Sequence, residues 1–284
     1  MAPGTTFRSS TMASAHPWSL HPVQRHRLQC RKRLPPPPRQ KSCVAITSAA
    51  GTQQSLSGAS TMEEAYDLLT ARVMHHLQRR SDSRSAGKFL VGVAGVPGSG
   101  KSSLAREVVA RLSERGTLAV NVPMDGFHYF KHQLDTMPDP RVAHARRGAE
   151  WTFDASAFVT CLQQLKSGRG VAPSFDHGVG DPRPGMIEVG EQHQVLVAEG
   201  NYLLLAAEPW CHLQPLWDDT WYIDCEVDVA MQRVFERQTG NGVAAEVSRR
   251  RVATNDRPNA ELVVTTKDRA AVLVPTLPLQ HVKK

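Results

Sequence analysis

The first 62 residues of this 284-residue chain contain no aspartate or glutamate, although they contain eight lysine or arginine residues. The segment is rich in Ser, Thr, Arg and Pro, includes the run Pro35 to Pro38 and shows no sustained apolar periodicity. This composition is typical of organellar transit peptides, with an ordinary basic disordered tail as the alternative. The stretch Val44 to Ala50 resembles the cleavage region of plastid precursors. We therefore expect a transit peptide over residues 1–50, disorder to about residue 60, and a plastid location, with the mitochondrion second.

The remainder of the chain lacks an excess of charge of either sign. The whole chain has 34 Lys and Arg residues, of which 26 lie beyond residue 62, against 27 Asp and Glu residues. Proteins that bind nucleic acids present a basic surface, so this balance argues against a nucleic-acid partner.

Long apolar runs and metal-type cysteine spacings are also missing. No apolar run approaches the roughly 20 residues that a membrane-spanning helix requires, and we expect no membrane partner. The cysteines of the body, Cys161, Cys211 and Cys225, share no short spacing, which argues against a zinc site.

One complete motif stands out from this background. The segment from Gly95 to Ser102 is a G-x-x-x-x-G-K-S phosphate-binding loop. Phe89 to Ala94 before it has the pattern of a buried strand, and the apolar residues after it repeat at helical spacing, which is the context that the motif requires. The sequence therefore predicts binding of a nucleoside triphosphate, which we take to be ATP.

The spacing of this motif suits the chemistry of a polyphosphate. Glycines let backbone N–H groups turn inward around the phosphates, Lys101 reaches the terminal phosphates, and the Ser102 hydroxyl ligates Mg²⁺. The residues predicted to bind the nucleotide are Gly95, Val96, Pro97, Gly98, Ser99, Gly100, Lys101, Ser102 and Ser103.

Apolar strand patterns alternate with helical patterns along the body. The predicted strands are Phe89–Ala94, Ala119–Met124, Val195–Ala198, Thr220–Ile223 and Ala271–Val274. Such alternation predicts an α/β fold, the three-layer α/β/α sandwich of P-loop NTPases, with a mainly parallel sheet and ligands at the carboxyl ends of its strands. We place this domain at residues 88–278, after an N-terminal helix and linker at residues 61–87.

Asp125 follows the second predicted strand directly, which places its carboxylate at the same sheet edge as the phosphate loop. A carboxylate beside an acceptor hydroxyl can orient it and take its proton during phosphoryl transfer. Asp125 is therefore the candidate catalytic base, with a helix N-cap or turn aspartate as the structural alternative. Gly126 is expected to leave room for the substrate.

Five segments together resemble one superfamily of P-loop kinases. They are PMDGFH, RRGAEWTFDA, PSFDHGVGDP, VAEGNYLLL and NDRPNAEL, spread over residues 88 to 275. The superfamily contains uridine kinases, phosphoribulokinases and bacterial-type pantothenate kinases, and the chain most resembles its uridine kinase-like, or fructokinase-like, branch of bacteria, fungi and plants. One departure is Glu150, which stands where this branch is expected to have proline, so the local turn geometry is an open question.

The resemblance implies roles for several residues. It supports Asp125 as the base and implies that Glu199, a Walker-B-like acid, meets Mg²⁺ directly or through water; the structural alternative for Glu199 is the cap of a helix beginning near Tyr202. It implies Mg²⁺ and ATP as cofactors, a small-molecule hydroxyl acceptor, and a homo-oligomer as in many relatives.

The turn-rich stretch from Ser174 to Pro182 is expected to form a loop or hairpin that resembles an acceptor-binding flap of this family. Its carboxylate and imidazole groups suit a polyhydroxyl substrate. The candidate acceptor-binding residues are His128, Arg147, Asp176 and His177. Surface-turn residues, and a solvated basic face at Arg147, are the structural alternatives.

Arg233 and Arg237 lie four residues apart on the helical pattern Val227 to Gln238, and Gly240 and Gly242 follow as a hinge. This resembles the lid of small-molecule kinases, in which an arginine stabilises charge on the transferring phosphoryl group and closure excludes water. A solvated basic helix face is the alternative.

Together these observations predict an ATP- and Mg²⁺-dependent kinase that moves the γ-phosphoryl group to a hydroxyl of a nucleoside, a sugar or a pantothenate-like metabolite. The alternative is an ATP-binding regulatory or assembly protein without a metabolite acceptor, because one scaffold hosts many functions.

Overall fold

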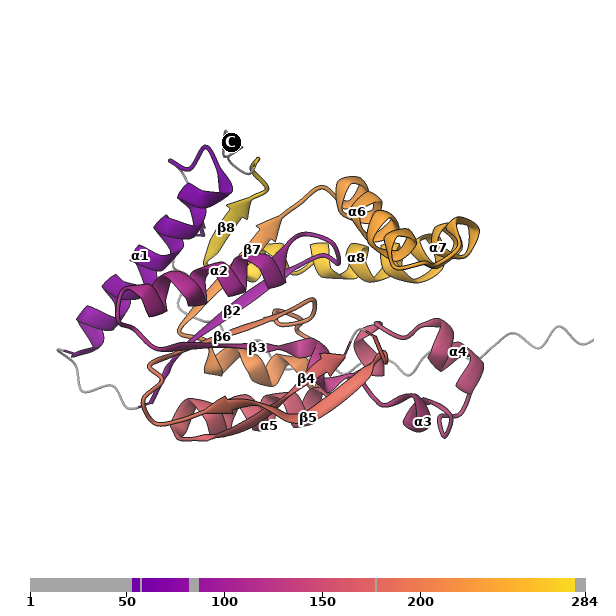
Figure 1. Cartoon of the computed structure of the whole chain (residues 1–284), viewed down its shortest axis with the longest axis horizontal. Helices are drawn as coiled ribbons and strands as arrows, with labels where there is room; N and C mark the ends of the chain where they lie inside the picture. The colour runs from indigo at the N-terminus through magenta and orange to yellow at the C-terminus, as the bar shows by residue number, and fades with distance from the viewer. Residues whose placement is uncertain (1–52, 57, 82–86, 177, 279–284) are drawn as a thin grey trace, which may run out of the picture. The chain divides into compact units, whose positions relative to one another are not determined.

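The computed structural model describes residues 53–56, 58–81, 87–176 and 178–278, all within the structural unit Gln40–Lys284. A six-stranded parallel sheet in the order β1-β8-β7-β2-β6-β3 forms its centre (Figure 1). The strands are β1 (Gln54–Ser55), β2 (Phe89–Gly95), β3 (Ala119–Pro123), β6 (Val195–Gly200), β7 (Asp219–Asp224) and β8 (Val272–Pro275). The expected transit peptide at residues 1–50 lies outside the described residues, as does His177.

Each of the five predicted strands is present, and β2 lies in the interior of the sheet between β6 and β7. Every residue of β2 is buried, as expected for a strand that is paired on both sides and covered on both faces. The edge strand β1 has no counterpart in the prediction, because a two-residue strand is too short to show a period of two.

Helices cover both faces of the sheet. On one face α1 (Met62–Ser81) and α2 (Lys101–Glu114) pack against alternate strand residues such as Val91 and Val93. On the other face, α5 (Ala155–Ser167), α8 (Arg257–Val264) and the 3-10 helix η3 (Trp210–Leu216) pack against the intervening residues such as Leu90 and Ala94. The period of two along the strands therefore builds the predicted three-layer sandwich.

Side-chain caps begin two of these helices. The Glu64 N–H donates to Thr61 Oγ1 at 3.3 Å ahead of α1, and the Ala157 N–H donates to Asp154 Oδ1 at 2.9 Å at the start of α5. Each cap satisfies one of the backbone donors that the first turn of a helix leaves unpaired. No described helix has both the length and the apolar character needed to cross a membrane.

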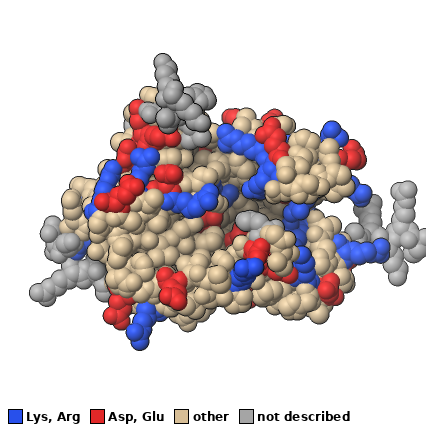
Figure 2. Space-filling model, in the orientation of Figure 1, with Lys and Arg blue, Asp and Glu red and all other residues tan. Residues whose placement is uncertain are grey.

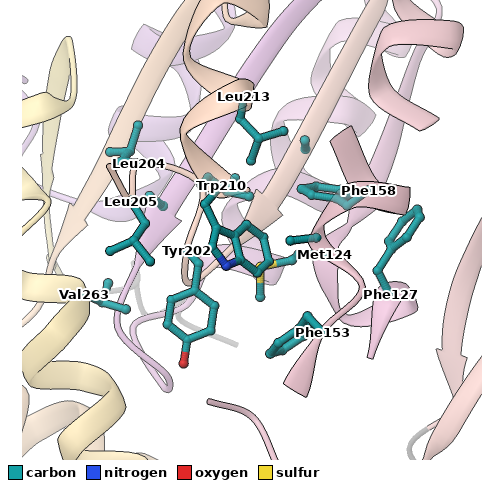
Figure 3. Close-up of a cluster of buried hydrophobic side chains, with 14 of the residues drawn as sticks. Met124, Phe127, Phe153, Phe158, Tyr202, Leu204, Leu205, Trp210, Leu213 and Val263 are labelled. Atoms are coloured by element: carbon teal, nitrogen blue, oxygen red, sulfur yellow. The ribbon is translucent and has the colours of Figure 1, made fainter. Parts of the chain in front are cut away.

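An aromatic cluster supports the loops at the carboxyl ends of β3 and β6 (Figure 3). Met124 and Phe127 are buried in this cluster on either side of Asp125. Beyond β6, the rings of Tyr202 and Trp210 lie 5.5 Å apart. Because these side chains are packed, the short 3-10 helix η1 (Met124–Phe127), which carries Asp125, has a fixed place at the sheet edge.

The predicted flap is an antiparallel hairpin of β4 (Gly170–Asp176) and β5 (Asp181–Val189). The first strand of this hairpin lies directly against Gly126, which was expected to leave room for the substrate. A Cβ atom on Gly126 would lie only 2.3 Å from the carbonyl oxygen of Pro173 in β4. The expectation that Gly126 leaves room for substrate is therefore wrong, because the backbone of the hairpin fills that space.

The C-terminal helices form one further group beside the sheet. After α6 (Val227–Gly240), the segments α7 (Ala245–Arg251), η4 (Val252–Asp256) and α8 follow without interruption, and η4 is a π-helical turn. Glu150 begins the 3-10 helix η2 (Glu150–Thr152). The remaining short helices are α3 (Lys131–Leu134), α4 (Pro140–Ala145) and η5 (Lys267–Arg269).

Candidate active site

The phosphate loop connects β2 to α2, and its glycines are required by its geometry. Gly98 and Gly100 have φ angles of +83° and +100°, values that side chains with a Cβ rarely adopt. A Cβ atom on Gly98 would also lie 2.4 Å from the carbonyl oxygen of Ala230 in α6. The backbone of the loop is therefore in direct contact with the predicted lid helix.

Lys101 and Ser102 begin α2 and face the end of β6. Lys101 Nζ donates to the Val96 carbonyl at 2.9 Å, and Ser102 Oγ donates to Glu199 Oε1 at 2.8 Å. Glu199 is aligned with Val93 of β2 and Pro123 of β3, so it lies at the carboxyl edge of the sheet where the loop begins. The parallel register thus joins two segments that are 97 residues apart in the chain.

Burial dominates the electrostatics of this group. Burial lowers the pKa of Lys101, an effect that the negative charges of Glu199 and Asp125 oppose. Burial raises the pKa of Glu199, and the charge of Asp125 raises it further, whereas Lys101 and the Ser102 hydrogen bond lower it. The charges of Lys101, Glu199 and Asp125 therefore interact at a single site.

The structure removes the alternative role of Glu199 as a helix cap. Glu199 is the penultimate residue of β6, and the segment around Tyr202 is a turn. The next helix is η3, which begins at Trp210. The helix-cap alternative is wrong, because the EGNY sequence ends a strand here and does not begin a helix. The metal role of Glu199 stays a prediction.

Asp125 lies in η1, directly beyond β3, and it is half-buried. Its carboxylate makes no hydrogen bond to any residue that the structure describes, and Pro123 rather than Asp125 is the N-cap of η1. The Asp125 side chain is therefore neither a cap nor a turn anchor. Its charge acts on both Lys101 and Glu199, as expected for a base beside the phosphates.

His128 packs behind Asp125. Its Nδ1 lies 2.9 Å from the backbone carbonyl of Asp125, and its ring centroid lies 3.9 Å from that of Phe153 and 4.8 Å from that of Phe175. Burial lowers the pKa of His128. The structure shows that His128 contacts Asp125 of η1 and Phe175 of the flap. Its predicted contact with the acceptor stays a prediction.

Asp176, one of the predicted acceptor-binding residues, has partners within the flap. Asp176 accepts hydrogen bonds from the N–H groups of Gly178 and Val179 at 2.8 and 3.0 Å, and it pairs with Arg183 at 2.5 Å. Asp176 therefore organises the hairpin turn. Its role in binding the acceptor stays a prediction, as does that of His177, which lies outside the described residues.

Arg147 crosses from the segment before η2 to the flap. Its Nη2 donates to Asp181 Oδ1 at 2.7 Å and to the Tyr129 carbonyl at 2.9 Å, and its Nη1 donates to the Gly180 carbonyl. The alternative of a solvated basic face is therefore wrong for Arg147, because its guanidinium fastens the hairpin tip.

The two predicted lid arginines lie on α6 and both are exposed. Arg233 Nη1 approaches Cys225 Sγ at 3.8 Å, and the charge of Arg237 contributes to lowering the pKa of Lys101. Figure 2 shows a hollow on this face, bordered by Lys and Arg side chains, between α6 and the tip of the β4–β5 hairpin as oriented in Figure 1.

The contacts of Arg146 with the C-terminal helices were not predicted from the sequence. Arg146 Nη1 donates to the Thr254 carbonyl at 2.7 Å, and Arg146 Nη2 donates to Asn259 Oδ1 at 3.1 Å. The sequence gives no signal for these contacts, because they join segments 108 and 113 residues apart.

Comparison with known proteins agrees with this geometry. The model of the Phosphoribulokinase / Uridine kinase family matches residues 90–283. The chain belongs to this family. It is accordingly a P-loop kinase of the phosphoribulokinase and uridine kinase type, as its motifs predicted.

Relatives of this P-loop kinase occur in fungi and bacteria. A Schizosaccharomyces pombe protein named "Putative uridine kinase C227.14" is 38% identical over 225 residues, which covers 77% of this chain and 93% of the relative. The solved structure of a "putative fructose transport system kinase" from Silicibacter sp. TM1040 is 33% identical, with a TM-score of 0.65, and the match covers 72% of this chain and 98% of that one.

A more distant solved structure shares the fold alone. A "Possible Uridine Kinase" from Bacillus stearothermophilus is 16% identical with a TM-score of 0.54, covering 75% of this chain and 98% of that one. The α/β architecture predicted from strand and helix patterns is thus confirmed by the structures of P-loop kinases.

The residues of this P-loop kinase fit the ATP and Mg²⁺ that its family implies. The Ser102 hydroxyl and the Glu199 carboxylate are the hard oxygen donors that Mg²⁺ prefers. No side chain caps the start of α2, so its first N–H groups point to a site for an anion. The buried Ser99 Oγ has no hydrogen-bond partner among the described residues, which leaves a further polar group at the loop for phosphate.

Proposed function

We propose that this protein transfers the γ-phosphoryl group of ATP to a hydroxyl group of a small metabolite, with Asp125 as the general base. The observation that carries the proposal is the convergence of two carboxylates on one buried lysine. Asp125 and Glu199 both act on Lys101, and they come from the ends of two adjacent strands. A protein that only switches conformation with nucleotide needs Glu199 and Lys101 but has no use for an acceptor base.

In the proposed reaction the carboxylate of Asp125 orients the acceptor hydroxyl and takes its proton. A bond forms between the acceptor oxygen and the γ-phosphorus while the bond from that phosphorus to the β,γ-bridging oxygen breaks, and ADP leaves. Lys101 and the N–H groups of the loop stabilise the charge that develops on the phosphate oxygens. The proton moves to a carboxylate that makes no competing hydrogen bond to a described residue.

Mg²⁺, when bound by Ser102 and Glu199, supplies positive charge that neutralises the phosphates. The Ser102–Glu199 hydrogen bond holds both ligands in place for it. Arg233 and Arg237 contribute from α6 when the nucleotide draws the helix toward the loop, because both side chains are exposed and the charge of Arg237 already acts on Lys101. Closure of α6 then excludes water from the phosphoryl group.

The acceptor is proposed to be a polyhydroxylated metabolite. The names of the similar Schizosaccharomyces pombe and Silicibacter proteins refer to uridine and to fructose transport, which makes nucleosides and sugars the first candidates. His128 and Arg147 would frame the acceptor between η1 and the flap. The rings of Phe153 and Phe175 on either side of His128 keep it in place.

A phosphorylation screen with labelled ATP tests this proposal. The full chain, supplied with MgCl₂, is incubated with nucleosides, free sugars, sugar phosphates and pantothenate, and the products are separated by chromatography. We expect one class of metabolite to acquire label and to accelerate ADP release strongly. Tight binding of ATP without acceleration by any of these compounds would contradict a metabolite kinase and favour the regulatory alternative.

We also propose a plastid location for the protein, with the mitochondrion second. The support is the absence of acidic residues from residues 1–62. Import of the full chain, tagged at its C-terminus, into isolated plastids and mitochondria tests the proposal, and failure to enter either organelle would contradict it.

A further inference from the structure

The π-helical turn η4 lies between the lid helices and the loop that holds the flap. The wider turn directs Asn255 and Asp256, adjacent in sequence, into the interior, where they are 1% and 8% exposed. A π-helical turn is rare and is frequently found at functional sites. The position of η4 therefore calls for an explanation beyond packing.

On one side, η4 holds the backbone of Arg147. Asn255 Nδ2 donates to the Arg147 carbonyl at 2.9 Å, and Asn255 Oδ1 accepts from Asn259 Nδ2 at 3.3 Å. Arg146 binds the same helix through the Thr254 carbonyl. Because Asn255 is buried with both its donor and its acceptor in use, it has little freedom to move independently of Arg147.

The side chain of Arg147 extends this connection to the flap. Its guanidinium binds Asp181 and the Gly180 carbonyl at the hairpin tip. Asp181 Oδ1 also accepts from the Lys131 N–H at 3.0 Å, at the start of α3. The hairpin tip is thus joined to Asn255 through a single residue, Arg147.

On its other side, η4 is joined to the lid. Gln238 of α6 donates to Asp256 Oδ2 at 3.0 Å and accepts from Ser248 of α7 at 2.9 Å. Helix α6 in turn touches the phosphate loop at Gly98. A movement of α6 and α7 on nucleotide binding would therefore reach η4 through these partly buried hydrogen bonds.

We propose that Asn255 is a positioning residue that couples the nucleotide-bound position of the lid helices to the arrangement of the acceptor flap. The proposal rests on the proposed function, because it assumes that ATP binds at the phosphate loop. When η4 moves, the hydrogen bond from Asn255 moves the backbone of Arg147 with it. The hydrogen bonds of the Arg147 guanidinium then move Gly180 and Asp181 of the flap. The acceptor site would then reach its final shape only when nucleotide is bound.

Hydrogen exchange with a non-hydrolysable ATP analogue and MgCl₂ tests this coupling without knowledge of the acceptor. In the unmodified full chain, the analogue is expected to slow exchange at the phosphate loop, at residues 227–251 and at residues 178–183 of the flap. We expect slowing at the flap of about 5-fold or more, which is the lower end of the range typical of coupled sites. In Asn255→Ala, the slowing at the loop and the lid should remain and that at the flap should disappear.

A matched control distinguishes coupling from loosening. Asn241→Ala, at the exposed C-cap of α6, should keep the response of the flap to the analogue. If Asn255 had only a structural role, its replacement would speed exchange of the flap equally with and without the analogue. If Asn255→Ala does not fold, Arg147→Lys replaces it, because a lysine cannot bind Gly180 and Asp181 with a planar fork.

Two results would overturn the coupling: an unmodified flap that does not respond to the analogue, or a flap that still responds in the folded Asn255→Ala variant. A different failure identifies the proposed function as the error. If the analogue does not slow exchange even at the phosphate loop, the chain does not bind ATP there, and both proposals fall.

Discussion

The two halves of the candidate active site are held by different kinds of contact. The phosphate half is the loop between β2 and α2, neighbouring elements of the chain, and its shape comes from backbone conformation and from one close backbone approach at Gly98. The acceptor half is the Arg146–Gly148 segment with the β4–β5 hairpin. It is held by side-chain hydrogen bonds between residues that are far apart in the sequence. The separations are 108 residues for Arg146 and Thr254, 54 for Tyr202 and Gly148, and 34 for Arg147 and Asp181.

This difference bears on how the protein can vary. A loop defined by its own backbone keeps its shape when surrounding side chains change. A loop held by distant side chains can be reshaped by one substitution, which suits the part of a kinase that selects its acceptor. The same dependence makes the acceptor half responsive to the lid, since η4 supplies several of its contacts.

The largest effect is expected where the two halves meet, at Asp125. Asp125→Asn keeps the shape of the side chain and removes the proton acceptor, so turnover should fall by about 10²–10⁴-fold. Affinity for ATP, measured by calorimetry, should change little, because Lys101 and the loop remain. Asp139→Asn, at the exposed N-cap of α4, is the control and should retain turnover. Undiminished phosphoryl transfer in Asp125→Asn would refute the base assignment.

The next effect concerns the phosphate half alone. Gly98→Ala adds a Cβ to a left-handed residue and directs it at the Ala230 carbonyl, so it should lower the free energy of unfolding by about 3 kcal/mol. Gly100→Ala is a matched variant, since its Cβ meets nothing within 4 Å. It should cost about 1–2 kcal/mol from backbone strain only. Urea unfolding of both measures the difference, and equal losses would argue against the contact with α6.

A smaller loss is expected in the acceptor half. Tyr202 Oη donates to the Gly148 carbonyl at 2.6 Å, so Tyr202→Phe leaves this acceptor without its donor and should cost about 1–3 kcal/mol. Tyr222→Phe also removes the hydroxyl of a buried tyrosine, but this hydroxyl has no hydrogen bond to a described residue. It should change the urea midpoint little. A Tyr202→Phe variant as stable as Tyr222→Phe would show that this hydrogen bond contributes nothing.

The smallest effect is a dependence on pH. Burial lowers the pKa of His128 below its ordinary value of 6.5, so the unfolded chain binds this proton more readily than the folded protein. Stability from the neutral ring is complete above 6.5 and declines as the pH falls through that value toward the folded pKa. His128→Phe should therefore flatten the fall in unfolding free energy below pH 6.5. His132→Phe, on the exposed α3, is the control, and an unchanged slope in His128→Phe would contradict the burial effect.

The phosphate half and the sheet could be predicted because their signals are local. Eight consecutive residues form the motif of the phosphate loop, and buried strands such as β2 and β6 are visible in the sequence as apolar runs. The positions of Asp125 and Glu199 followed as well, since parallel strands bring their carboxyl ends to one edge. None of these steps requires knowledge of which distant residues touch.

The acceptor half could not be predicted to the same depth. Gly126 was expected from the sequence to leave room for a ligand, but in the fold the backbone of β4 occupies that space. Arg147 and Asp176 had the right chemistry for an acceptor, but the structure shows their contacts within the flap. No role could be assigned to Asn255 from the sequence, because its hydrogen bond to the Arg147 carbonyl is visible only in the structure.

Residue order alone thus settles where the phosphates go and which strands carry the carboxylates, because a glycine-rich turn and an apolar period are properties of neighbouring residues. The folded chain decides which side chains remain available to a substrate. Hydrogen bonds from Arg146, Arg147 and Asn255 join segments up to 108 residues apart, and such pairings exist only after the layers have packed.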